Sequence, residues 1–350
     1  MPDMNARAFY HAEPRAREDK PDFTALPAAL VADIEMHIGG KIIQGDIAWG
    51  GYSPAFSALI TRRDGKKFFI KGSHPEHKAH GAKMLAQEMD AYRYSKGIRR
   101  VAPEFIGHVT HGSEDDWHLG IWQAIPGAHL VRQWDELSLK AVAYALKNLY
   151  GTPPEPGIPP MAETNFICDI TSGALGWEKF VNNPDRYAHF AAMFTDEPAA
   201  RKWLDDHLPD LVEAASQPAA NHDDVILNFD LRSDNIVFDD MGAAFLVDWP
   251  NACRGPAGYD IISLSANIMA DCGYPAWDAQ AYICKTVNIN IPKADRIRIL
   301  CQLSGYFALQ AYRRVPDKLP RLRWMQKSML YSLTNWLRRE GFAQFLPYFC

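Results

Sequence analysis

Residues 225–249 read VILNFDLRSDNIVFDDMGAAFLVDW, and the rest of the chain is organised around them. Two short apolar runs, at 236–238 and 244–247, enclose the turn-type residues Asp-Asp-Met-Gly. Apolar runs joined in this way predict an antiparallel β-hairpin. Pairing of the two strands would set Asn235, which precedes the first run, beside Asp248, which follows the second.

A third polar residue belongs to the same group. Asp230 lies five residues before Asn235 and close behind the apolar run 225–227. Asp230, Asn235 and Asp248 would then meet at the ends of buried strands. Oxygen ligands of this kind suit Mg²⁺, which takes one or two protein oxygens besides phosphates and water. The alternative is that these residues only punctuate turns, as Asp and Asn often do.

The sequence DLRSDN at 230–235, followed by VDW at 247–249, resembles the catalytic signature of the aminoglycoside phosphotransferase and choline kinase family. That family shares its fold with protein kinases, whose catalytic loop and metal-binding Asp follow the same order. The resemblance implies that Asp230 orients or deprotonates an acceptor hydroxyl. It also implies that Asn235 and Asp248 hold Mg²⁺, with ATP or GTP as the phosphoryl donor.

One position departs from the family pattern. The family has His-Gly or His-Asn directly before the catalytic Asp, whereas this chain has Asn228-Phe229. Phosphoryl transfer is catalysed mainly by positioning and charge neutralisation, so the departure is compatible with activity. It also leaves open a protein of another class, a nucleotide-binding pseudoenzyme that serves as a regulatory module.

A glycine pair stands between two strand-like runs nearer the N-terminus. Gly50, Gly51 and Ser53 lie between a run that reaches Ala48 and a second run at 55–61. Backbone N–H groups at glycines approach phosphates closely because no Cβ intervenes. These three residues are therefore predicted to bind the nucleotide, although a glycine pair also closes ordinary hairpins.

A lysine and a glutamate are predicted to pair in the same region. Lys71 ends the apolar strand 66–71, and Glu88 lies on the apolar stripe of a helix expected at 82–95. A carboxylate on a buried helix face needs a partner, and Lys71 is the natural candidate. Kinase-type small lobes contain such a pair, in which the Lys holds the α- and β-phosphates. The alternative is a Glu that reaches solvent at the edge of the stripe.

Three further residues are assigned by their place in the chain. The segment 122–127, WQAIPG, resembles the hinge of the family, so backbone groups of Gln123 and Ala124 are expected to bind the adenine edge. Asp260 has the place of the family's helix-start acid, which steadies the catalytic loop; a helix N-cap explains it equally well. Asp260 is therefore predicted to give structural support.

Composition limits the classes of protein that fit. The 350 residues carry 37 basic and 42 acidic side chains, a net charge of −5, which argues against a nucleic-acid-binding protein. The six cysteines form no close CxxC pair, which argues against a zinc site or a disulfide framework. No apolar run approaches transmembrane length and the N-terminus has no signal-peptide core, so the expected compartment is the cytoplasm.

These features together predict an α+β, bilobal, protein-kinase-like fold. A flexible N-terminal arm (1–22) would precede a nucleotide-binding N-lobe with a small antiparallel sheet (23–126). A mostly helical C-lobe (127–350) would carry catalysis and acceptor binding. The predicted enzyme is a small-molecule kinase that moves the γ-phosphoryl group of ATP or GTP to a hydroxyl group. It would bind a nucleoside triphosphate and a small molecule, as a monomer or a homodimer, and no membrane.

The sequence does not decide which small molecule accepts the phosphoryl group. The resemblance favours an aminoglycoside; choline, another amino alcohol, a sugar or a macrolide are alternatives, and a protein substrate is disfavoured because no APE-type activation segment is present. Family members that modify aminoglycosides line the acceptor site with acids. The candidates here are Asp205, Asp206, Asp210, Asp271 and Asp278. The basic residues clustered at 313–327 are interpreted as a solvated helix face.

Overall fold

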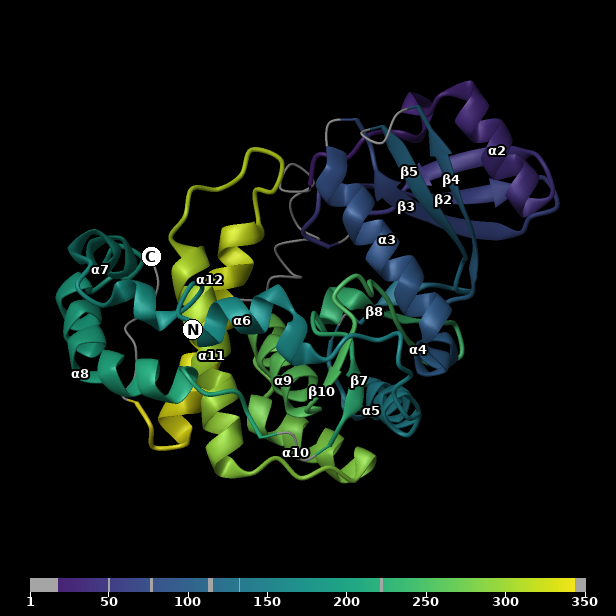
Figure 1. Ribbon diagram of the computed structural model, residues 1–350. Coiled ribbons are helices and arrows are strands. Elements are labelled where there is room, and N and C mark those ends of the chain that lie inside the picture. Colours follow the sequence, from purple (N-terminus) through teal and green to yellow (C-terminus); the bar gives the residue numbers. More distant parts are fainter. Residues whose placement is uncertain are drawn as a thin grey trace.

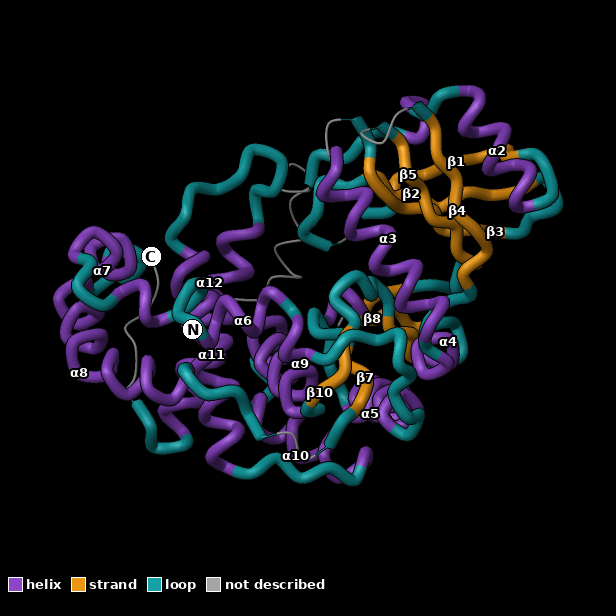
Figure 2. Tube along the Cα trace, in the orientation of Figure 1, coloured by secondary structure: helices purple, strands orange, loops and turns teal. Residues whose placement is uncertain are grey.

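Two lobes make up the computed structural model, which describes residues 18–49, 51–75, 78–112, 116–131, 133–220 and 223–343. The smaller lobe contains a five-stranded sheet, and the larger one is mostly helical (Figure 1). Figure 2 shows the strands gathered in the smaller lobe, with only short strands in the larger one. The predicted α+β bilobal fold is therefore confirmed.

The N-lobe sheet is antiparallel throughout. Its strands, in spatial order, are β1 (Ile42–Ile47), β2 (Phe56–Arg62), β3 (Lys67–Ser73), β5 (Trp117–Gln123) and β4 (Phe105–His111). The turn from β2 to β3 contains Gly65, whose φ of 86° lies in the left-handed region that favours glycine. The helical elements of this lobe are η2 (Phe23–Ala25), α2 (Ala28–Ile38), α3 (Lys78–Tyr94) and α4 (Lys96–Val101).

Helix α2 covers one face of the N-lobe sheet. Leu30, Ile34 and Ile38 recur along α2 at helical spacing and are buried. They share a hydrophobic core with alternate residues of the strands, among them Phe56 and Ile60 of β2. Because side chains alternate across a strand, the residues between these point to the opposite face of the sheet, toward α3 and the large lobe.

The C-lobe contains the predicted hairpin. It consists of β8 (Ile236–Phe238) and β9 (Ala244–Leu246), paired antiparallel with Ile236 opposite Leu246, which confirms the prediction. The other strands of the lobe are β6 (His129–Leu130), β7 (Val225–Leu227) and β10 (Cys253–Gly255). Its helical elements are α5 (Glu136–Tyr150), η3 (Met161–Glu163), α6 (Asn165–Thr171), η4 (Trp177–Phe180), α7 (Pro184–Ala191), α8 (Glu197–Ala215), η5 (Ser233–Asn235), α9 (Gly258–Cys272), α10 (Ala276–Val287), α11 (Lys293–Ala311) and α12 (Leu322–Arg339).

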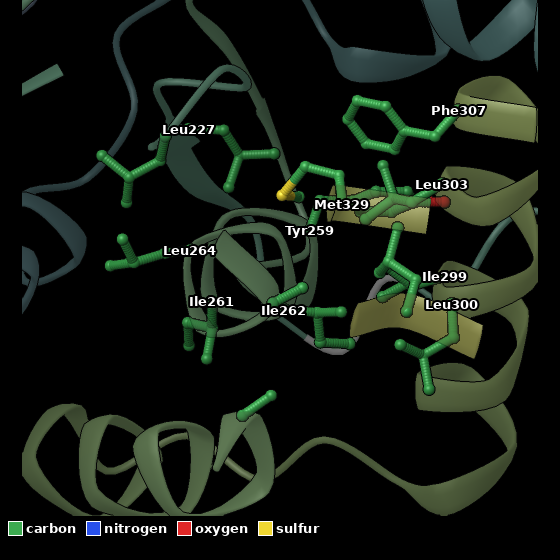
Figure 3. Close-up of a cluster of buried hydrophobic side chains, with 14 of the residues drawn as sticks. Leu227, Tyr259, Ile261, Ile262, Leu264, Ile299, Leu300, Leu303, Phe307 and Met329 are labelled. Carbon is green, nitrogen blue, oxygen red and sulfur yellow. The ribbon is translucent and has the colours of Figure 1, made fainter. Parts of the chain in front are cut away.

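Helix α9 is the centre of the C-lobe core. Its side chains are buried on nearly every side, as expected of a largely apolar helix enclosed by other elements. Ile262 of α9, Ile299 of α11 and Met329 of α12 belong to one buried cluster, shown in Figure 3. This packing fixes the start of α9, and the first turn of α9 reaches the candidate site described below.

The N-terminal segment differs from the expected flexible arm where the structure describes it. Residues 1–17 of that arm lie outside the described residues. Glu18 is buried, with 1% of its surface exposed, and forms an ion pair with Arg321, which is equally buried. Asp19 donates its backbone N–H to the carbonyl of Lys318 at 3.2 Å. This part of the arm is therefore held against the C-lobe, because a buried carboxylate requires a partner such as Arg321.

Two properties of the described part of the chain concern membrane-spanning helices and the cysteine side chains. No helix in these ranges is both long enough and apolar enough to cross a membrane. Among the cysteines that the structure describes, Cys168, Cys253, Cys284 and Cys301 are free thiols, and Cys272 donates from Sγ to the carbonyl of Ile268 at 3.3 Å.

Candidate active site

The hairpin brings together the two segments of the sequence signature. Val247 donates its N–H to the carbonyl of Asn235 at 3.0 Å, one step beyond the last strand pair. Asn235 therefore stands opposite Val247, and Asp248 is the next residue of the chain at the open end of the hairpin. Asn235 also donates from Nδ2 to the carbonyl of Asp230 at 2.8 Å, which draws the third residue of the group to the same place.

The Asp230 carboxyl is held by an arginine from its own loop. Nη1 of Arg232 lies 2.5 Å from Oδ1 of Asp230, and Nε of Arg232 lies 3.0 Å from Oδ1 of Asp234. Burial raises the pKa of Asp230 to about 7, although the charge of Arg232 opposes this rise. About one third of the Asp230 side chain is exposed, so the carboxyl faces outward from the loop. Arg232 is a site residue that the sequence reasoning missed, although it lies inside the quoted signature.

The backbone on both sides of the site adopts an uncommon conformation. Among the described residues, four non-glycine residues have a positive φ, and two of these are Phe229 (61°) and Asp248 (65°). Such conformations are costly for residues with a Cβ and persist where the surrounding structure determines them. One of these residues directly precedes Asp230, and the other is a predicted metal ligand, so two of the four conformations occur at the site.

Asp260 binds the backbone of the catalytic loop. It is fully buried in the first turn of α9 and accepts the N–H groups of Asn228 and Phe229, each at 2.8 Å. Burial raises the pKa of Asp260 to about 7, while the two backbone hydrogen bonds oppose this shift. The N-cap of α9 is Ala257, so the N-cap explanation of Asp260 is wrong. Its position supports the predicted structural role.

Replacing Asp260 with asparagine is expected to lower the free energy of unfolding by about 1–3 kcal/mol, the cost of a buried donor left without its acceptor. The amide would offer only one acceptor atom, and its NH₂ group would face the second backbone N–H. Urea unfolding measures the change. Asp278→Asn, an exposed acid on α10, is the matched control and should shift stability by less than about 0.5 kcal/mol. Equal stability of Asp260→Asn and wild type would contradict the proposed role.

Asn228, which replaces the histidine of the family, ties the two signature segments together. It is fully buried, and its Nδ2 donates to the carbonyls of Val247 at 3.3 Å and Asp248 at 3.0 Å. Its Oδ1 accepts the N–H of Asp230 at 3.2 Å. The Asn228 amide group thus forms hydrogen bonds to both loops. Asparagine therefore satisfies the buried polar groups at the position where the family has histidine.

Lys71 pairs with one carboxylate in each lobe, Glu88 in the N-lobe and Asp248 in the C-lobe. Its Nζ lies 2.7 Å from Oδ1 of Asp248 and 2.9 Å from Oε2 of Glu88, so the predicted Lys–Glu pair is present. Burial by itself would lower the pKa of Lys71, but the two carboxylates outweigh it and hold the pKa above its ordinary value. Burial would raise the pKa of Asp248, but Lys71 outweighs it and lowers the pKa. Lys71 and Asp248 are therefore both charged at neutral pH.

Glu88 also contacts the end of the hairpin directly. Its Oε1 accepts the N–H of Trp249 at 3.3 Å, and only 3% of the residue is exposed. Burial raises the pKa of this carboxyl. In Figure 1, α3 runs from the N-lobe sheet toward β8 of the C-lobe, which is how a residue of α3 reaches Trp249.

The glycine turn lies close to the catalytic loop. Gly50 lies outside the described residues; Gly51 has a φ of 76°, and a Cβ there would lie 4.0 Å from Oδ2 of Asp234. Ser53 accepts the N–H of Ala55 at 3.2 Å and so shapes the turn itself. The turn thus lies over the loop that carries Asp230.

Tyr52 of the same turn reaches into the large lobe. Two guanidinium groups lie over its ring, with that of Arg232 at 5.6 Å and that of Arg321 at 5.9 Å from the ring centroid. Burial raises the pKa of the Tyr52 hydroxyl, so the hydroxyl is neutral. Nothing in the local sequence identified Tyr52 or Arg321 as neighbours of the site.

The hinge residues use their backbone N–H groups within the N-lobe. Gln123 donates to the carbonyl of Glu104 at 2.9 Å, and Ala124 donates to the carbonyl of Lys67 at 3.2 Å. Their N–H groups are therefore occupied. The prediction that these two residues bind the adenine edge then depends on their carbonyl groups.

The donor atoms suit Mg²⁺ bound together with a nucleotide. Within the described residues, no three His, Cys, Asp or Glu side chains are arranged to hold a metal ion by themselves. Mg²⁺ bound with a nucleotide needs only one or two protein oxygens, because phosphates and water complete its coordination. Asp248, with 40% of its side chain exposed, and the neighbouring Asn235 supply oxygens of this kind.

Solved structures share this fold at low sequence identity. An aminoglycoside phosphotransferase from Alicyclobacillus acidocaldarius is 15% identical, with a TM-score of 0.53 over 90% of this chain and 97% of that one. Spectinomycin phosphotransferase APH(9)-Ia is 14% identical, with a TM-score of 0.53 over 86% and 92%. Choline kinase LicA from Streptococcus pneumoniae is 10% identical, with a TM-score of 0.51 over 87% and 98%.

The sequence itself matches a family model. No curated protein matches the chain as a relative. The model of the phosphotransferase enzyme family matches residues 47–282, which is more than half of the chain and includes Lys71, Asp230, Asn235 and Asp248. The chain therefore belongs to the phosphotransferase enzyme family and is a small-molecule kinase.

Proposed function

We propose that the protein transfers the γ-phosphoryl group of ATP or GTP, with Mg²⁺, to a hydroxyl group of a small molecule. The observation that carries this proposal is the junction of the two lobes, where Lys71 binds Asp248 and Asn235 binds the loop of Asp230. A phosphate-binding lysine, metal-binding oxygens and an acceptor base are the parts that phosphoryl transfer requires.

Asp230 is proposed to orient the acceptor and to take its proton. As the acceptor oxygen bonds to the γ-phosphorus and the bond to the leaving nucleoside diphosphate breaks, the hydroxyl proton passes to the Asp230 carboxylate. A pKa of about 7 suits a base that works near neutral pH. Arg232, bound to Oδ1 of Asp230, keeps the carboxyl in one orientation.

Lys71 and the hairpin end are proposed to receive the phosphates. Lys71 is a charged donor held between two carboxylates, so it is in place before a nucleotide binds. Asn235 and Asp248 would hold Mg²⁺, which supplies further neutralisation of the phosphate charge.

The acceptor class that the family resemblance favours is an aminoglycoside. Such polycations need acids in the acceptor site, and of the five candidate acids Asp271 has support from the structure. It is buried, and its charge raises the pKa of Tyr52, a residue of the glycine turn. The remaining candidates are on α8 and α10, where Asp206, for example, pairs with Lys202.

A second acceptor class, a hydroxyl compound with an anionic group, is favoured by the charges beside α11. Tyr306 of α11 packs on Phe166, with ring centroids 5.1 Å apart. Phe166 packs edge-on against Phe229, the neighbour of Asp230, at 5.3 Å. A continuous series of ring contacts therefore connects Phe229, the neighbour of the proposed base, with Tyr306 of α11.

Two arginines, Arg313 and Arg323, interact electrostatically with Tyr306. Burial raises the pKa of Tyr306, and the charges of Arg232, Arg313 and Arg323 oppose that rise, so these arginines interact electrostatically with its hydroxyl group. Arg323 donates to Oε1 of Gln326 at 2.7 Å, which is a neutral acceptor. Among the described residues, neither arginine forms an ion pair with a carboxylate, so an anionic group on the acceptor would find two cations there.

The test is acceptor-stimulated release of ADP or GDP from ATP or GTP, with Mg²⁺, across aminoglycosides, amino alcohols, neutral sugars, macrolides and hydroxyl compounds bearing a carboxylate or phosphate. Stimulation by any acceptor supports the proposed reaction, and the most effective acceptor identifies the class. Nucleotide binding without stimulation by any member would contradict the proposed reaction and favour the pseudoenzyme.

A charge variant separates the two acceptor classes. With an anionic acceptor, Arg323→Gln should raise KM about tenfold, because a charge-assisted hydrogen bond is lost. With an aminoglycoside, the same variant should leave KM unchanged or lower it. Arg314→Gln removes an exposed arginine that pairs with Asp317 and serves as the matched control, with no change of KM in either case.

A further inference from the structure

Residues 18–20 form a short bridge between the two lobes. Glu18 forms a buried ion pair with Arg321, which directly precedes α12 in the C-lobe. Two residues later, Lys20 donates from Nζ to Oγ of Ser57 at 2.9 Å and to the carbonyl of Ala48 at 3.3 Å, both in the N-lobe. The chain therefore passes from one lobe to the other immediately beside the glycine turn.

The bridge brings Lys20 to the face of the sheet that carries Lys71. Ser57 of β2 stands directly opposite Lys71 of β3 in the strand register. Opposite residues of an antiparallel pair project from the same face with their Cβ atoms about 5 Å apart. The ammonium group of Lys20, bound to Ser57, thus lies on the side of the sheet from which Lys71 reaches the end of the hairpin.

The charges around Lys20 place it in the same electrostatic environment as the site. Burial lowers the pKa of Lys20 to about 8, Glu18 and Asp248 raise it, and Lys71 and Arg321 lower it. Lys20 is thus a cation at neutral pH and interacts with both Lys71 and Asp248. A second ammonium group near Lys71 is unfavourable by itself and becomes favourable when phosphates bind between them.

We propose that Lys20 is a second phosphate-binding lysine, carried to the nucleotide site by a segment that precedes the N-lobe fold. This inference rests on the proposed function. It assigns Lys20 to the phosphates and not to the base or the ribose, because its contacts are beside the glycine turn and opposite Lys71.

The ion pair between Glu18 and Arg321 gives the bridge its fixed position. Arg321 also faces the ring of Tyr52 from the glycine turn, so the anchor of the bridge and the turn meet at one guanidinium group. Binding of phosphates by Lys20 would therefore draw on contacts from both lobes. Glu18 is a positioning residue in this arrangement, because it acts on the nucleotide only through Lys20.

The experiment compares the affinities of wild type and Lys20→Met for ATP, ADP and adenosine by calorimetry. The loss of affinity should grow with the number of phosphates: about ten- to hundredfold for ATP, less for ADP, and less than about twofold for adenosine. Lys20→Arg keeps the charge and should retain most of the ATP affinity. Lys66→Met removes an exposed lysine of the same lobe and is the matched control, with unchanged affinities.

A second variant tests the bridge. Glu18→Gln should also weaken ATP binding, and the double variant Glu18→Gln/Lys20→Met should bind ATP no more weakly than Lys20→Met alone, because both substitutions act through the Lys20 ammonium group.

Unchanged ATP affinity in Lys20→Met, or equal losses for ATP and adenosine, would overturn the proposal. Tighter ATP binding would also overturn it, since it would mean that the bridge blocks the site. If the wild-type protein binds and turns over ATP, any of these results refutes only the proposed role of Lys20. If the wild-type protein binds no nucleotide, the proposed function itself is refuted.

Discussion

Replacing Asp230 with asparagine is expected to reduce kcat by about 10²–10⁴-fold, the usual contribution of a positioned general base. The amide has nearly the same shape as the carboxyl but does not accept the hydroxyl proton. The ion pair with Arg232 is lost as well, so the loop also loses an orienting contact. Nucleotide affinity should stay within about threefold of wild type, because Lys71 and Asp248 are untouched.

The measurement is steady-state turnover with the best acceptor of the panel, together with ATP affinity by calorimetry. Asp234→Asn is the matched control, since Asp234 is the other carboxylate bound by Arg232. Its effect on kcat should be smaller than that of Asp230→Asn, because Asp234 is not proposed to meet the acceptor. Wild-type turnover in Asp230→Asn would refute the assigned role of Asp230.

Asp248→Ala is expected to weaken Mg²⁺-dependent binding of ATP by about a hundredfold or more, since it removes a charged metal ligand and the partner of Lys71. Lys71 keeps its contact with Glu88 at 2.9 Å, so its position is not lost entirely. Binding measured without Mg²⁺ should change far less, because the missing carboxylate then has no metal to hold.

ATP affinity measured with and without Mg²⁺ separates these two effects. Asp240→Ala is the matched control: it removes an exposed carboxylate from the opposite end of the same hairpin and should leave both affinities unchanged. A Mg²⁺-dependent gain in affinity equal to that of wild type would show that Asp248 is not a metal ligand.

The features of this protein that could be predicted from its sequence are local ones. The hairpin that carries Asn235 and Asp248 was predictable because its two strands are adjacent in the chain and their pairing follows from the turn between them. The pair of Lys71 and Glu88 was predictable because a carboxylate on the apolar face of a helix requires a partner. The fold class followed from the order of these features along the chain.

The atoms through which distant segments bind one another became known only from the folded arrangement, even where the sequence had assigned a residue its role, as it did for Asp260. Asp260 binds the backbone of the catalytic loop across 31 and 32 positions, and Arg321 binds Glu18 across 303. Such contacts leave no periodicity or spacing in the sequence. For the same reason a segment expected to be a loose arm is held in place at Glu18 and Lys20.

The hinge residues and Asn228 show the same difference between what could be predicted from the sequence and what required the folded structure. The sequence located the hinge residues Gln123 and Ala124, but the tertiary structure decided that their N–H groups are used within the N-lobe. Asn228 was visible as a departure from the family pattern, whereas its bonds to Val247 and Asp248 required both loops to be in place. Local sequence fixes which groups are available, and tertiary packing decides which groups they meet, because hydrogen bonds and ion pairs form only at contact distance.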